Sequence, residues 1–152
     1  MALEQFLELT GITGEASAPD ARGTIPIASW SFGVSRDGES SAQFRRFRFS
    51  KPTDSSTPLL LALCTQATVV PQAKLLARSM GHRDPRLVID LREVTIVDVM
   101  TSHDRATGEL VDEVALRFAR LWVGGAVVDR RGIGDQVNWF AWDIPNDRPA
   151  TA

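Results

Sequence analysis

The sequence contains a single cysteine, Cys64, and two histidines, His82 and His103. A lone cysteine excludes a disulfide within the chain, which favours folding in a reducing compartment. A zinc site takes three or four ligands at recognisable spacing, and the sequence offers no such cluster. We therefore expect neither a metal nor a cofactor.

A strong charge of one sign is also missing. Seventeen basic residues nearly balance nineteen acidic ones, which leaves a net charge of −2. This balance argues against a dedicated nucleic-acid or membrane-surface binder. The longest uncharged run, Ser55–Ala73, is interrupted by Pro58 and Pro71, so we do not expect it to span a bilayer. The first nine residues carry two Glu and no basic residue, so we expect no signal peptide.

The length of 152 residues is typical of one domain, which we place over residues 1–152. Within it, the stretch Phe44–Pro52 predicts a half-buried strand. Phe47 and Phe49 alternate with arginines at a period of two, so we expect both phenylalanines in the core. Pro52 lacks the donor that a strand ladder needs and ends the strand.

A short apolar helix is predicted directly after this strand. Residues 54–57 are good N-cap types, and Pro58 is favourable just inside a helix start. So short a helix is not stable alone. We expect it to dock on the sheet through Leu59, Leu60 and Leu63, with Cys64 as a packed, inert thiol.

Thr24–Val34 is predicted as one strand with two unlike faces. Trp30 and Phe32 share one face, and Ser29 and Ser31 share the other. We expect the aromatic face in the core and the serine face in water. Leu116 and Phe118 alternate with smaller or charged residues in the same way and are expected in the core.

The remaining segments give a mainly β chain. Leu3–Leu9 fits strand or helix, and Gln72–Met80 is helical by propensity. Arg86–Met100 is a long β-rich run with a phase slip near Arg92-Glu93 that suggests a bulge or bend. Asn138–Ile144 is a closing strand, whereas Gly124-Gly125 and 130–135 are expected to be loops. These patterns predict a small antiparallel β-barrel or sandwich of six to seven strands with one short helix.

Two patterns bear on enzymatic chemistry. His103 beside Asp104 could belong to a small enzyme, but the sequence has no Gly-x-Ser-x-Gly elbow, and a histidine in a polar turn is more often solvated. Gly132-Ile-Gly134 lacks the third glycine and the strand-to-helix context of a dinucleotide loop.

A binding reading rests on Phe44-Arg-Arg-Phe-Arg-Phe49, which mixes cations with aromatic rings. It could be a stacking platform for a nucleic acid, or an amphipathic strand with phenylalanine in the core. The acidic overall balance favours the amphipathic strand.

Four motifs in order resemble the Hcp family, the tube proteins of bacterial type VI secretion. They are Ala-Ser-Trp-Ser-Phe-Gly at 28–33, Phe-Arg-Phe-Ser-Lys at 47–51 followed by Asp-Ser-Ser-Thr-Pro-Leu-Leu at 54–60, Leu-Val-Ile-Asp-Leu-Arg-Glu-Val at 87–94, and Glu-Val-Ala-Leu-Arg-Phe-Ala at 113–119 with Trp142-Asp-Ile144. The likeness covers nearly the whole chain. Ser35–Gln43 is shorter than the family's extended loop, which usually contacts the next ring.

The resemblance implies a non-enzymatic structural subunit without a cofactor. It implies a hexameric ring that stacks into a tube carrying effectors, with sheath, spike and effector proteins as partners. It implies assembly in the bacterial cytoplasm and export without a signal peptide, a strand at Gln72–Met80, and Ser29 and Ser31 facing the lumen. A tube-like protein of another contractile injection system would fit the same pattern.

Overall fold

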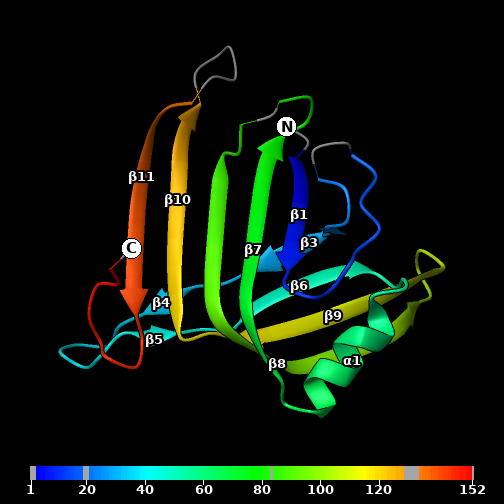
Figure 1. Cartoon of the computed structure of the whole chain (residues 1–152), viewed down its shortest axis with the longest axis horizontal. Coiled ribbons are helices and arrows are strands. Elements are labelled where there is room, and N and C mark those ends of the chain that lie inside the picture. The colour runs from blue at the N-terminus through cyan, green and yellow to red at the C-terminus, as the bar shows by residue number, and fades with distance from the viewer. Residues whose placement is uncertain (1–2, 19–20, 83, 129–133, 152) are drawn as a thin grey trace.

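A computed structural model describes residues 3–18, 21–82, 84–128 and 134–151 (Figure 1). The described elements are one helix and eleven strands: β1 (Leu3–Leu9), β2 (Ile25–Pro26), β3 (Ser29–Ser31), β4 (Val34–Ser35), β5 (Gln43–Phe44), β6 (Phe47–Pro52), α1 (Thr57–Thr65), β7 (Val69–Ser79), β8 (Leu87–Asp104), β9 (Glu109–Arg117), β10 (Arg120–Val128) and β11 (Gly134–Asp143). All strand pairs are antiparallel. The predicted class, mainly β with one short helix, is confirmed, although the strands are more numerous than predicted.

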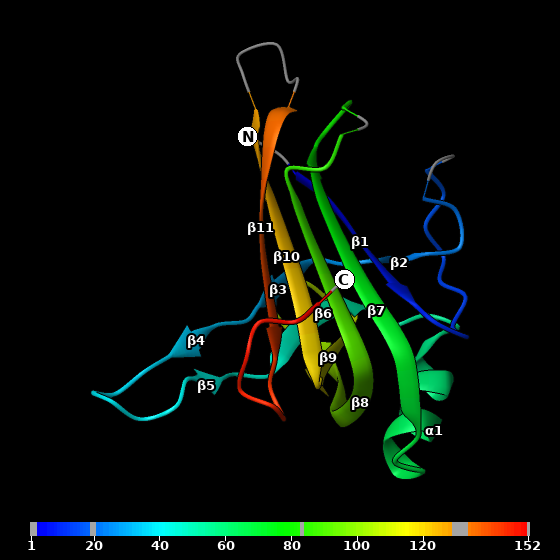
Figure 2. The ribbon, with the colours of Figure 1, turned by 60° about the vertical axis from the view of Figure 1, so that its left-hand side comes forward.

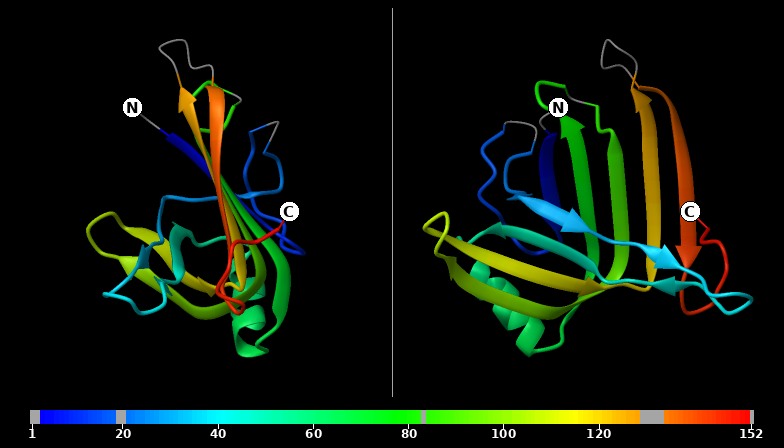
Figure 3. Two further views of the ribbon diagram at one scale, coloured as in Figure 1. Left: turned by 90° about the vertical axis from the view of Figure 1, so that its left-hand side faces the viewer. Right: turned by 180° about the vertical axis from the view of Figure 1, so that it is seen from behind.

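The long strand β8 organises the sheet because it belongs to two layers. Its first half, 87–92, pairs with β10 on one side and β7 on the other, and the pairing with β7 continues to Thr95. Its second half, from Thr95 on, pairs with β9. We call β2, β1, β7, the first half of β8, β10 and β11 the upright layer. We call the second half of β8, β9, β6 and β3 the crossing layer. Figures 1 and 3 show the second group running across the first.

The change of direction in β8 falls near the predicted phase slip. Glu93 has a φ of +53°, which few non-glycine residues adopt, and the register with β9 shifts between Ile96 and Asp98. The chain after β9 follows the same bend, since the Ala119 N–H donates to the Arg92 carbonyl at 3.0 Å. Two backbone irregularities close together in β8 thus separate the two layers.

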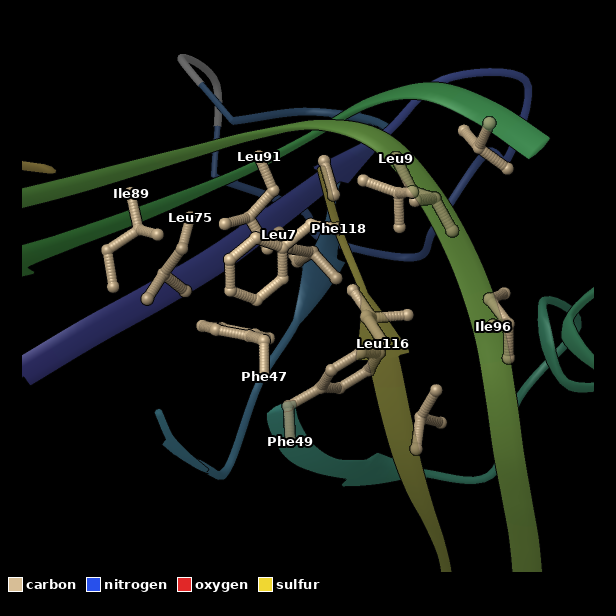
Figure 4. Close-up of a cluster of buried hydrophobic side chains, with 14 of the residues drawn as sticks. Leu7, Leu9, Phe47, Phe49, Leu75, Ile89, Leu91, Ile96, Leu116 and Phe118 are labelled. Carbon is tan, nitrogen blue, oxygen red and sulfur yellow. The ribbon is translucent and has the colours of Figure 1, made fainter. Parts of the chain in front are cut away.

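The core lies between these layers. Side chains of the upright layer point toward those of the crossing layer in Figure 4. Phe47, Phe49, Leu116 and Phe118 are all buried, with Phe47 and Leu116 at 0% exposure. At roughly 25 cal/mol per Å² of apolar area removed from water, this interior is the main source of stability.

Trp30 and Phe32 are only half-buried, although both pack against the core. The Trp30 ring stacks on Phe47 with centroids 5.9 Å apart, and its indole N–H donates to Gln5 Oε1. Thr24–Val34 is not one strand, because β2, β3 and β4 pair with three different partners. The paired strands β4 and β5 project away from both layers (Figure 2).

The helix docks by fewer residues than expected. Leu60 is fully buried, Leu63 and Cys64 are partly buried against the core, and α1 packs beside β8. The expectation for Leu59 is wrong, since this side chain is 45% exposed. The run of leucines did not reveal which side of so short a helix meets the sheet.

A buried charged cluster fixes the corner between β6 and α1. Lys51 Nζ lies 2.9 Å from Asp112 Oδ2 and 3.0 Å from Asp54 Oδ1, and both Lys51 and Asp112 have 0% exposure. The hydroxyls of Thr53, Thr57 and Thr101 also donate to Asp112. Lys51, Asp112, Asp54 and these three threonines form what we call the Lys51 cluster. It connects β6, β8, β9 and the start of α1.

The ionisation of these carboxylates follows from their partners. Burial alone raises the pKa of Asp112, but hydrogen bonds from Thr57, Lys51, Thr53 and Thr101 outweigh it, so its pKa lies below the ordinary 3.8. For Asp54, burial likewise raises the pKa, and bonds from Ser56 and Lys51 reverse the effect. Both groups are therefore charged at neutral pH.

Gln72–Ser79 is a strand, as the resemblance implies and against its helical propensity, because Ala73, Leu75 and Ala77 alternate into the core at the period of a strand. The expectation of a loop at Gly124-Gly125 is wrong, since both residues lie inside β10. A Cβ at Gly124 would lie 2.7 Å from the Trp139 ring, so a larger residue there would displace that ring. Of the other expected loop, 130–135, residues 130–133 lie outside the described residues, and Gly134 and Asp135 belong to β11 rather than to a loop.

We expect Leu60→Ala to lower the free energy of unfolding by roughly 2–5 kcal/mol, because it leaves a cavity under α1. Leu59→Ala is the matched control and should cost about 1 kcal/mol or less, since much of that side chain is already in water. Urea titration of both variants provides the measurement. Equal losses would show that α1 is oriented differently.

We expect Asp112→Asn to cost roughly 3–5 kcal/mol at pH 7, because Lys51 then keeps a buried charge with a weakened partner set. The lowered pKa of Asp112 means that its contribution is present above pH 3.8 and is lost as the pH falls through the folded-state pKa. The stability difference from wild type should therefore shrink in acid. Asp37→Asn, an exposed carboxylate, serves as the control; a pH-independent difference for Asp112→Asn would contradict the argument.

Candidate functional surface

The outer face of the crossing layer gathers the polar side chains that the sequence analysis singled out. Strand register places Ser31, Arg48, Ala115 and Asp98 in one row across four strands. The next row holds Ser29, Ser50, Glu113 and Met100. Ser29 and Ser31 are exposed, as expected for the face opposite Trp30.

These two rows form a shallow hollow of about 370 Å³. The Ser29 and Ser50 hydroxyls are hydrogen-bonded at 2.5 Å. Arg48 lies between serines and two carboxylates, Asp98 and Glu113, but none of these carboxylates approaches it within 4.0 Å. Met100, 57% exposed, is the one large apolar side chain facing outward in these rows. The surface is therefore hydrophilic and carries both signs of charge.

Sequence reasoning found the two serines and missed their neighbours. Arg48 could be assigned to this face because it alternates with Phe47 and Phe49. Asp98 and Met100 could not, because the register shift between Ile96 and Asp98 decides which residues of β8 face outward.

The nucleic-acid reading of Phe44–Phe49 is wrong. Phe47 and Phe49 are 0% and 3% exposed and face the core, and Phe44 packs against that core, so these rings offer no stacking platform. The strand is amphipathic, with its arginines in water.

The catalytic reading finds no support either. His103 and Asp104 are exposed at the end of β8, with His103 opposite Leu110. Among the described residues, no three His, Cys, Asp or Glu side chains are grouped so as to hold a metal ion. None of the helices in the part of the chain that the structure describes is long and apolar enough to cross a membrane.

Both edges of the crossing layer are open. Among the strands that the structure describes, β3 pairs only with β6, and β8 beyond Thr95 pairs only with β9. A strand with an unpaired edge presents a row of N–H and C=O groups that another chain can pair with. A further strand can therefore be added at each edge of the crossing layer.

Comparison with known proteins agrees with this architecture. The family model described as "Type VI secretion system effector, Hcp" matches residues 6–123. Protein hcp1 of Pseudomonas aeruginosa is 29% identical over 134 residues, which cover 81% of this chain and 83% of that protein.

Solved structures share the fold. Hcp1 from Salmonella typhimurium has a TM-score of 0.85 at 20% identity, covering 99% of this chain and 100% of the other. A type VI secretion system effector from Yersinia pestis has a TM-score of 0.79 at 19% identity, covering 92% and 99%. A family model that matches most of the chain, together with this fold, shows that the chain belongs to the Hcp family, the non-enzymatic tube proteins of the type VI secretion system.

Proposed function

We propose that this protein is the repeating subunit of the secretion tube, in which copies close into a ring and rings stack into a conduit for effectors. The observation that carries this proposal is the pair of open edges of the crossing layer. One edge is β3, and the other is the second half of β8. The ring is hexameric, as the resemblance to the family implies.

Ring closure solves a physical problem for these edges. Unpaired strands are an aggregation hazard, and full closure of a sheet removes them. β3 and β8 are different surfaces, so the contact between copies is head-to-tail, and such contacts form a ring when the rotation closes. Each copy then adds four strands to one continuous barrel.

The outer face of the crossing layer becomes the lumen wall in this arrangement. Ser29 and Ser31 lie on it beside Arg48, Asp98 and Glu113. A conduit that passes varied cargo must not hold that cargo tightly, and a hydrophilic surface with both signs of charge suits this requirement.

The other partners and the location follow from the same proposal. Residues 1–152 act as one tube domain that is assembled in the bacterial cytoplasm and surrounded there by sheath proteins. It is exported with the spike and effectors by the secretion machine itself, which requires no signal peptide.

We expect ring formation to protect the two open edges from hydrogen exchange. In rings, the amides of 29–31 and 96–104 should exchange more slowly than in dissociated monomers, because half of them gain partners. β9 is the internal control, since it is already paired on both sides within one copy. A monodisperse monomer at tens of micromolar by analytical ultracentrifugation would overturn the proposal.

We expect Ser31→Gln to leave the melting temperature and ring mass unchanged, because Ser31 is exposed and the longer side chain enters the lumen. It should change which effectors are retained in a pull-down. Trp30→Ala should instead lower stability by about 2–4 kcal/mol, since it removes the ring stacked on Phe47. Equal destabilisation by both variants would show that the two faces are wrongly assigned.

A further inference from the structure

A second hollow lies at one end of the crossing layer, outside the surface described above. It has a volume of about 540 Å³ and lies at the root of the β4–β5 hairpin, where β9 ends and β8 bends. Phe44, Val69 and Ile144 contribute apolar atoms to its wall. We call it the arginine groove, because Arg45, Arg46 and Arg117 line it.

The charges of the arginine groove are not balanced within the chain. Among the described residues, no carboxylate lies within 4.0 Å of Arg45, Arg46 or Arg117. The one acidic residue in the wall, Glu93, is already paired with Arg120 at 2.9 Å. The groove is therefore cationic although the whole chain is slightly acidic. Guanidinium groups bind carboxylates well, so the chemistry of the groove suits an acidic segment.

An acidic segment lies at the opposite end of the same layer. The turn between β8 and β9 carries Asp104 and Glu109, against one cation, Arg105. Leu110 beside it is 56% exposed. Arg117 and Glu109 are the last and first residues of β9, so about 26 Å of strand separates them at 3.3 Å per residue. They cannot meet within one copy.

We propose that the arginine groove receives the β8–β9 turn of a copy in the next ring. This inference rests on the proposed ring and tube. When identical rings stack head-to-tail, one end of each copy meets the other end of the next, and here the two ends carry opposite charge. The exposed Leu110 would lie against the apolar wall while Asp104 and Glu109 meet the arginines.

The tip of the β4–β5 hairpin is a weaker candidate for the groove. It also carries two carboxylates, Asp37 and Glu39. However, Ala42, Gln43 and Phe44 of that hairpin themselves line the groove, so hairpin and groove lie at the same end of the molecule. In head-to-tail stacking the hairpin of one ring faces away from the groove of its neighbour.

A charge-exchange experiment tests the contact. Four proteins are compared in buffer of low ionic strength: wild type, Arg117→Glu, the double variant Arg117→Glu/Glu109→Arg, and Arg22→Glu. The last is a control, because Arg22 is an exposed arginine that does not line the groove. Light scattering gives the ring mass, and negative-stain images give the fraction of rings that are stacked. Effector pull-down is measured in parallel.

We expect all four proteins to form rings. Wild type and Arg22→Glu should stack, Arg117→Glu should lose its stacks, and the double variant should recover them. Added salt should shorten the wild-type stacks, since exposed charges are screened. The inference would be overturned if Arg117→Glu stacked as well as wild type, or if the double variant did not recover its stacks. It would also be overturned if Arg117→Glu kept its stacks and lost effector capture. Absence of rings in wild type would instead overturn the proposed function.

Discussion

The pairing of Lys51 with Asp112 is the interaction on which the packing of β6, β9 and α1 depends. A lysine at 0% exposure is tolerated only when its charge is paired. Here two carboxylates lie about 3 Å from the Lys51 ammonium group, and threonine hydroxyls donate hydrogen bonds to the oxygens of Asp112. Asp112 stands on β9 and Lys51 on β6, so the pair also sets how those strands lie against α1. Because hydrophobic contacts alone would permit several positions of a nine-residue helix, directional bonds at its first turn select one of them.

The two faces of the crossing layer also differ in whether their side chains have partners within the chain. The inward rows of the crossing layer, including Phe47, Phe49 and Leu116, are apolar and closed by the upright layer. The outward rows hold serine, arginine and carboxylate side chains with few bonds among themselves. The crossing layer is closed on one face and has unpaired strands at its two edges, which further copies would pair in the proposed ring.

Alternation within a strand was readable from sequence, whereas relations between strands were not. The arginines that alternate with Phe47 and Phe49 mark the outer face and so predict both rings in the core, where the structure has them. The local pattern of Gln72–Met80 favours a helix, but propensity is weak and pairing with β1 and β8 overrides it, so that only the resemblance indicates the strand. The exposure of Leu59, and the meeting of Asp98 with Ser31 in one row, depend on helix rotation and on a register shift that local patterns do not encode.

The continuity of β8 through both layers has a mechanical consequence. Its eighteen residues pass from the upright layer into the crossing layer without interruption. A force applied to one layer therefore reaches the other along covalent bonds, and the neighbouring ladders resist it by many hydrogen bonds loaded together in shear. Two sheets joined only by side-chain packing would slide past each other under the same load. In the proposed tube, a push along the axis would therefore not separate the inner wall from the outer wall.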